Sequence, residues 1–198
     1  GASGCGGCRS RRCCPAPLVL ETEWKAKAGP VRLIDFVPPR GPSSSLSRIV
    51  EGIDGGVEMA GDIRFRVDYG HVVPWVRRDD SGITAIAGPD AAYLRTPAPL
   101  DGRGMAMVSE FTVRKGDRIT FVLSWAPSWV SRPEQIDAEA ALNDTLSFCQ
   151  EWSQRSQITG DYRQPVQRSL ITLKALTYAP TGGIVAAATT SLPEEIGG

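Results

Sequence analysis

The residues of this chain that could support chemistry begin with its cysteines. Four of the five lie within the first fourteen residues, as Cys5-x-x-Cys8 followed by Cys13-Cys14. Cysteine thiolates ligate zinc, but structural zinc sites join two such pairs across a domain-scale spacing or add histidines. Here the second pair is adjacent and the single histidine is distant, so we expect no metal site. Residues 1–16 are interpreted as a disordered tail, or as a mis-started reading frame joined to a genuine domain.

The single histidine, His71, precedes two valines and could act as a general base. No serine, cysteine or carboxylate accompanies it in a recognisable motif, so a surface or strand position is the simpler interpretation. The chain also lacks a Gly-x-Ser-x-Gly nucleophile elbow and a phosphate-binding glycine loop. We therefore expect neither catalysis by His71 nor a bound cofactor.

Near the end of the chain, Glu194 and Glu195 form a pair of neighbouring carboxylates. Two carboxyl groups divide acid and base roles when they face each other, about 6.5–9.5 Å apart in enzymes that invert a sugar bond. Neighbouring side chains of an extended segment point to opposite faces. We therefore do not expect this pair to flank one bond.

The totals describe an ordinary globular chain of 198 residues, which predicts one domain, or one domain and part of a second. Charged residues make up 22% of the chain and the net charge is zero, whereas nucleic-acid binders usually carry a basic excess. No run of about 18 apolar residues is present, so we expect no membrane span. The fifth cysteine, Cys149, lies on an apolar helix face, and since nothing demands an oxidising compartment, we expect a cytoplasmic protein.

Most of the chain from residue 18 to residue 125 has the pattern of β-strands. Residues 62–68 and 118–125 alternate polar and apolar side chains, which is typical of half-buried strands. In the second segment, Trp125 falls on the apolar face and is expected to be buried. Weaker strand patterns separated by turn residues occur at residues 18–24, 31–37, 47–53, 83–87 and 105–113. Many short strands without intervening helices predict an antiparallel β-sandwich.

After the strands, the periodicity becomes helical. Ser131-Arg132-Pro133-Glu134 has the form of a capping box, and a helix is expected from there to about Ser156. A second helix is expected to begin near Pro165. Its apolar side is formed by Val166, Leu170, Leu173 and Leu176. The fold class is therefore mainly β with C-terminal helices.

Several segments resemble one family. Residues 18–24 (LVLETEW), 31–40 (VRLIDFVPPR), 48–52 and 68–75 resemble the trehalase-like N-terminal domain of family 15 glycoside hydrolases of the bacterial glucoamylase/trehalase type. Residues 168–187 (RSLITLKALTYAPTGGIVAA), continued to residue 195, resemble the opening of that family's catalytic (α/α)6 barrel. The family's usual upstream strand-rich segment is replaced here by the cysteine-rich tail. Its aromatic- and arginine-rich glucose-binding stretch and its two catalytic glutamates would fall beyond residue 198.

This resemblance implies a division of the chain into residues 1–16 (tail), 17–130 (trehalase-like β-sandwich), 131–160 (linker helix) and 161–198 (start of a truncated barrel). It implies an inverting hydrolase of α-glucosidic bonds, with an α-glucan oligosaccharide or trehalose as its partner, whose isolated fragment is inactive. Thr190 and Ser191, with Glu194 or Glu195, would shape the sugar pocket or hold its loop. The alternative for these residues is a solvated loop.

The alternative function is a non-catalytic β-sandwich module that binds carbohydrate or protein. Trp75, Trp125 and Trp129 could form a flat platform on which sugar rings stack. Trp129 would otherwise pack where the β-domain meets the helices. The apolar side of the second helix is expected to remain exposed without further barrel helices, which would give poor solubility, because burying each leucine or valine is worth roughly 1.5–3 kcal/mol.

Overall fold

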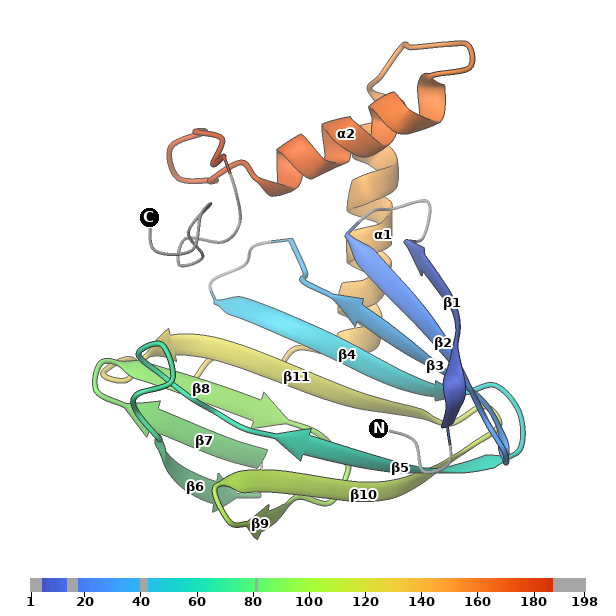
Figure 1. Cartoon of the computed structure of the whole chain (residues 1–198). Coiled ribbons are helices and arrows are strands. Elements are labelled where there is room, and N and C mark those ends of the chain that lie inside the picture. The colour runs from blue at the N-terminus through green and yellow to red at the C-terminus, as the bar shows by residue number, and fades with distance from the viewer. Residues whose placement is uncertain (1–4, 14–17, 40–42, 81, 187–198) are drawn as a thin grey trace, which may run out of the picture.

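The computed structural model describes residues 5–13, 18–39, 43–80 and 82–186 (Figure 1). The strands within these ranges are β1 (Cys5–Cys13), β2 (Val19–Ala26), β3 (Gly29–Phe36), β4 (Ser44–Gly52), β5 (Gly56–Ile63), β6 (Trp75–Asp79), β7 (Gly82–Ala87), β8 (Asp90–Arg95), β9 (Asp101–Arg103), β10 (Ala106–Arg114) and β11 (Arg118–Pro127). The helices are α1 (Ala138–Gln154) and α2 (Arg163–Ala175). The expected class, mainly β with two C-terminal helices, is confirmed.

The strands form two antiparallel sheets. The large sheet has the order β1-β2-β3-β4-β11-β8-β7-β6, and the small sheet has the order β5-β10-β9. The small sheet lies across one face of the large one (Figure 1). We call this face of the large sheet the inner face. Apolar side chains from both sheets meet there, among them Val31, Val50, Val57 and Val113.

Two chain segments pass together from one sheet to the other. β4 pairs with β11 in the large sheet, and their continuations β5 and β10 pair in the small sheet. At the corner, Gly52 N–H donates to the Asp117 carbonyl at 3.0 Å, and Gly116 N–H donates to the Gly52 carbonyl at 2.9 Å. A Cβ at Gly52 would lie 2.0 Å from the Arg114 carbonyl oxygen, so only glycine fits this close approach.

The opposite, outer face of the large sheet is covered by α1. Ala138, Ala141 and Leu142 of α1 pack on side chains of β2, β3, β4 and β11, namely Val19, Ile34, Phe36, Ile49 and Val122. Arg118 of β11 fixes the first turn of α1, because its guanidinium bonds Glu139 at 2.7 and 2.9 Å and Glu51 of β4 at 2.7 Å. These strands of the large sheet are thus covered by α1 on the outer face and, in part, by the small sheet on the inner face.

The second helix packs on the far end of the first (Figure 1). Cys149 and Ile171 are the buried residues of this contact, and both are 1% exposed. Trp152 Nε1 donates to the Leu170 carbonyl at 3.3 Å. Of the apolar side expected on α2, Leu173 is 47% exposed, as expected, while the other three residues are half-buried. The buried residue of the contact is Ile171, which lies outside that set.

The first helix begins later than the capping-box pattern predicted. Asp137 caps α1, and its carboxylate accepts from the N–H groups of Glu139 and Ala140 at 2.9 and 3.2 Å. Residues 131–137 are not helical. Their carbonyls bond elsewhere, since Arg95 of β8 donates to the carbonyls of Pro133 and Glu134.

One strand also ends earlier than its alternation predicted. Residues 118–125 lie within β11, as expected, but of residues 62–68 only Asp62 and Ile63 belong to a strand. The partner strand β10 begins at Ala106, and its pairing with β5 ends at Met107 opposite Ile63. Alternation continues to Asp68, but a strand needs a partner, and β10 supplies none there. Neither α1 nor α2 is long and apolar enough to cross a membrane, and the described residues contain no other helix of that kind.

Candidate functional site

The four residues expected to shape a sugar pocket, Thr190, Ser191, Glu194 and Glu195, lie outside the described residues. His71 is described, and it is exposed in the loop between β5 and β6. Its Nδ1–H donates to the Asp68 carbonyl at 2.9 Å. Asp68 and Tyr69 adopt positive φ there, both at 52°. His71 therefore stabilises a tight turn.

The cysteine side chains of the N-terminal tail lie outside the part of the chain whose side chains the structure describes. Among the residues whose positions the structure describes, no group of three histidine, cysteine or acidic side chains could hold a metal ion. Cys149 is buried as a free thiol, and burial raises its pKa. A buried, protonated thiol is a poor nucleophile.

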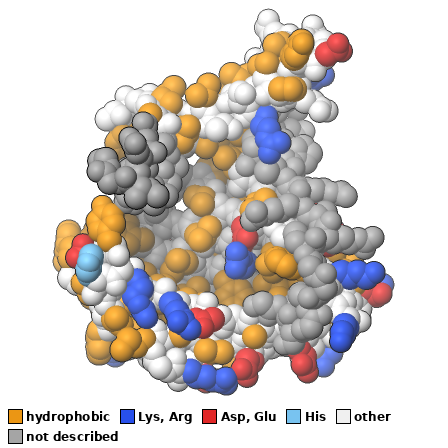
Figure 2. All heavy atoms as spheres, viewed as in Figure 1, with side chains coloured by type: hydrophobic (Ala, Val, Ile, Leu, Met, Phe, Trp, Pro, Cys, Tyr) orange, Lys and Arg blue, Asp and Glu red, His pale blue; other side chains and the backbone are white. Residues whose placement is uncertain are grey.

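A cavity with a volume of about 620 Å³ lies between the two sheets. We call it the inter-sheet cleft. Figure 2 shows this face of the molecule hollowed, with hydrophobic side chains on the walls of the hollow. Both sheets contribute apolar side chains to the cleft: Trp24, Leu33, Leu46, Val50, Met59, Ile63, Phe65, Leu94, Phe111, Phe121 and Leu123.

On the side of the small sheet, the cleft is lined at one position by a residue without a side chain, Gly61. The pairs that face inward along β5 and β10 are Val57–Val113, Met59–Phe111, Gly61–Ser109 and Ile63–Met107. Gly61 has no side chain, and a Cβ added there would meet only Ser109, at 3.7 Å for its Cβ and 3.9 Å for its carbonyl oxygen. Gly61 therefore leaves space in the cleft beside β5, whereas its partner Ser109 is fully buried and does not line the cleft.

Opposite this gap, the large sheet presents an ion pair on its apolar inner face. Arg48 of β4 and Asp35 of β3 are cross-strand partners, and the guanidinium donates from Nε and Nη2 to the two carboxylate oxygens at 2.6 and 2.9 Å. The carboxylate bond raises the pKa of Arg48. The Arg48 side chain is 52% exposed, so the pair remains partly hydrated inside the cleft.

The other carboxylate in the cleft, Asp62, is also paired. Arg64 donates to both its oxygens at 2.9 Å, and this bond lowers the pKa of Asp62. An inverting glycosidase needs one carboxyl group whose pKa is raised, so that it stays protonated and serves as general acid. Asp35 and Asp62 are each held by an arginine, so the cleft is unsuited to glycosidic acid–base catalysis.

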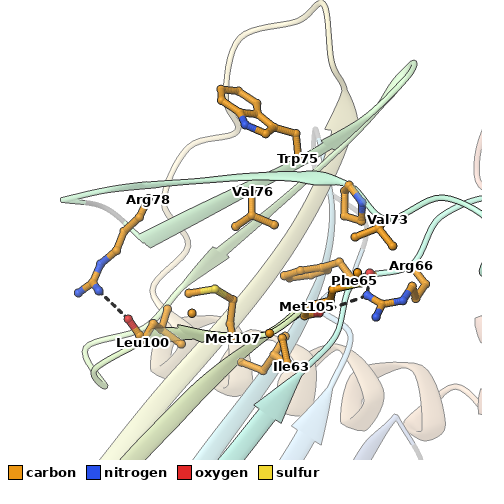
Figure 3. A pocket seen from close by; sticks show the side chains of 14 residues that line it. Ile63, Phe65, Arg66, Val73, Trp75, Val76, Arg78, Leu100, Met105 and Met107 are labelled. Carbon is orange, nitrogen blue, oxygen red and sulfur yellow. Dashed lines mark hydrogen bonds between the residues drawn. The ribbon is translucent and has the colours of Figure 1, made fainter.

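A second cavity, of about 450 Å³, lies at the edge of the sandwich between β6 and the β9–β10 hairpin. Figure 3 shows Val76 and Met107 facing each other across it, and Trp75 pointing away from it. Arg78 donates to the Leu100 carbonyl at 2.6 Å, and Arg66 donates to the Phe65 carbonyl at 2.6 Å. Its walls are mostly apolar, and its polar side chains are occupied in holding the loops.

The three tryptophans do not form a common platform. Across neighbouring strands, Trp75 is paired with Ile86, Ile86 with Ala91, and Ala91 with Ala126. Because paired residues share one face of a sheet, Trp75 lies on the same outer face of the large sheet as Ala126. Trp125, the neighbour of Ala126, therefore points to the inner face. Trp125 was expected to be buried, but it is 47% exposed and donates to Asp90 at 2.9 Å, because it lies beyond the area that the small sheet covers. Trp129 is 74% exposed.

Sequence reasoning did not select Asp35, Arg48 or Gly61, although one signal was available. Asp35 falls on the same strand face as Leu33, and Arg48 on the same face as Leu46 and Val50. A charged residue on an apolar strand face indicates either a partner on the next strand or an opening to solvent. Both are found here.

Comparison of the sequence with known proteins finds similarity to trehalases. No protein-family model matches the chain. A trehalase of Thermoplasma volcanium is 32% identical over 199 residues, covering 91% of this chain and 30% of the relative. A trehalase of Mycolicibacterium smegmatis is 29% identical over 218 residues, covering 93% of this chain and 32% of the relative. The chain thus resembles trehalases over most of its length and spans about a third of theirs.

Similarity among solved structures is weaker. A putative kojibiose phosphorylase from the human microbiome covers 78% of this chain and 23% of its own, with 10% sequence identity and a TM-score of 0.38. A match at this level defines neither the fold nor the function. The relationship to trehalases therefore rests on the sequence.

Proposed function

We propose that this chain is part of a trehalase-type glycoside hydrolase and that the intact protein hydrolyses the α-glucosidic bond of trehalose. The observation that carries the proposal is the similarity to trehalases over 91% of the chain. Resemblance to family 15 adds the finer features: inversion at the anomeric carbon, and α-glucan oligosaccharides as the alternative, glucoamylase-type substrate. A cytoplasmic location, expected from the sequence, is part of the same proposal.

Within that enzyme, we infer that the chain supplies the accessory β-sandwich, a linker helix and the first helix of the catalytic (α/α)6 barrel. The packing of α2 across the end of α1, away from the sheets, supports this division. The arginine pairing of Asp35 and Asp62 supports placing the acid and base outside the sandwich. Residues 190–195 would then contribute to the sugar pocket through Thr190, Ser191, Glu194 or Glu195.

Glucose release from trehalose and from maltotriose tests this proposal. The 198-residue chain and a protein of the relatives' full length, extended with the genomic sequence after residue 198, are assayed side by side. We expect the long protein to release glucose and the short chain to release none. Trehalose preference would favour the trehalase type, and maltotriose preference the glucoamylase type.

Two outcomes would contradict the proposal. Clear turnover by the short chain would show that the 198 residues themselves contain an acid pair. Absence of turnover by the long protein, together with saturable glucan binding by the short chain, would favour the non-catalytic carbohydrate-binding module.

A further inference from the structure

We propose that the inter-sheet cleft binds a small amphipathic molecule whose apolar body ends in an uncharged hydroxyl group. The site is separate from any glycosidic chemistry, and the inference does not depend on the proposed function. It follows from three properties of the cleft: a fixed width, apolar walls, and a polar spot with no net charge.

The cleft is held open by packed clusters at its two ends. At one end, Val31, Val57 and Val113 are at most 1% exposed. At the other end, Ile83 and Leu94 are buried together with Leu100. Because both ends are closely packed, the sheets cannot approach each other in the middle to close the gap at Gly61. The cavity is therefore preformed, and a ligand would not have to separate the sheets.

The walls define the body of the ligand. A cavity of about 620 Å³ lies within the range that holds drug-sized molecules, about 300–1,000 Å³. Leu33, Phe121 and Leu123 remain only half-buried in the cleft, and Leu46 is 48% exposed. An apolar body would remove these surfaces from water, which favours binding.

The Arg48–Asp35 pair defines the head group. Arg48 uses Nε and Nη2 for Asp35, which leaves the two N–H groups of Nη1 able to donate, and the carboxylate can accept a further hydrogen bond. A hydroxyl both accepts from Arg48 and donates to Asp35. An anionic head would be repelled by the Asp35 carboxylate and a cationic head by the Arg48 guanidinium. A neutral hydroxyl is therefore the complementary group.

Calorimetric titration of the full chain with four ligands of equal chain length tests the head group. The ligands are 1-decanol, used below its solubility limit, and decyl glucoside, decanoate and decylammonium, each used below its micelle concentration. We expect the two hydroxyl-bearing ligands to bind about tenfold more tightly than the two ions, because a site built for a hydroxyl rejects groups that leave its polar atoms unpaired. Decanol and decyl glucoside together distinguish a simple alcohol from a sugar-headed lipid.

Filling the gap tests the location. Gly61→Leu places a side chain in the middle of the cleft from a strand position with room for its Cβ. It should weaken binding about tenfold or more by occupying the cavity. Gly56→Leu is the matched control, because Gly56 is an exposed position on the same strand and does not line the cleft. Binding to this control should equal that of the unaltered chain.

Changing one charge at a time tests the chemistry. Asp35→Asn leaves Arg48 as an unbalanced cation and should shift the preference to decanoate. Arg48→Met leaves Asp35 unbalanced and should shift it to decylammonium. Similar affinity for all four ligands, unchanged by Gly61→Leu, would show non-specific adsorption to exposed apolar surface and overturn the proposal. Absence of binding by any ligand would also overturn it.

Discussion

The two faces of the large sheet differ in how they are covered. On the outer face, α1 packs directly on Ile49, which is 0% exposed, and on its neighbours. On the inner face, the small sheet seals only the ends and leaves Leu46 48% exposed over the cleft. Two residues of the same strand, β4, thus differ sharply in burial. The difference indicates that the outer face contributes stability and the inner face is available for binding.

The largest effect should come from removing core volume on the sealed face. Ile49→Ala should lower the free energy of unfolding by about 2–5 kcal/mol, because it leaves a cavity under α1. Leu46→Ala on the open face should cost less than about 1 kcal/mol. Urea unfolding followed by circular dichroism measures both. Equal losses would mean that the open face is closed in solution.

The next largest effect concerns the ion pairs of the two faces. Arg118→Ala should cost about 1–2 kcal/mol, because Arg118 joins Glu51 of the sheet to Glu139 of α1 through charged hydrogen bonds. Arg48→Ala in the open cleft should cost about 0–1 kcal/mol, as exposed pairs do. Hydrogen exchange of α1 amides should accelerate in the first variant only. Unchanged exchange would argue against Arg118 as the tether.

A smaller effect should follow from removing the cap of α1. Asp137→Ala should cost about 1 kcal/mol, since two N–H groups lose their acceptor. Ser131→Ala is the control, because Ser131 lies outside the helix although its sequence pattern resembles a cap. Thermal unfolding distinguishes them. A larger loss for Ser131→Ala would restore the capping-box interpretation.

The smallest effect near neutral pH concerns Cys149, which is buried where α1 packs against α2. Burial raises the pKa of its thiol in the folded state, so the folded protein keeps this proton to a higher pH than the unfolded chain does. Stability from this group is present below the unfolded thiol's pKa and is lost as pH rises through the folded one. In a variant with the other four cysteines changed to serine, iodoacetamide should modify Cys149 far more slowly than free cysteine. Rapid modification at neutral pH would contradict its burial.

The sequence predicted the strands better than it predicted their faces. β11 was recognised from its alternation, but the face of Val122 and Ser124 is more buried than the face of Trp125, because α1 covers it. Serine side chains usually indicate a strand face exposed to solvent. Here Ser47 is 0% exposed, and the hydroxyl groups of the buried residues Ser45 and Ser124 form a hydrogen bond of 3.1 Å. Alternation of polar and apolar residues identifies a strand. It does not show which face of the strand will be the more deeply buried when other elements pack on both faces.

The site was less predictable than the fold. Gly61 looks like any strand glycine, and its place beside the cleft depends on the pairing of β5 with β10, which lies far along the chain. Arg48 and Asp35 form a pair only because β3 and β4 adopt one particular register. Such pairings follow from long-range packing. Local patterns of polarity do not contain them.

The ribbon of four strands that links the sheets has a consequence for synthesis. Arg118 of β11 bonds Glu51 of β4 across 67 residues of chain. Because synthesis adds about 5–20 residues per second, Arg118 leaves the ribosome roughly 3–13 s after Glu51 does. During that interval β4 is an unpaired sheet edge in the growing polypeptide, and edges of this kind recruit other strands. The nascent chain is therefore most prone to aggregation before β10 and β11 have emerged.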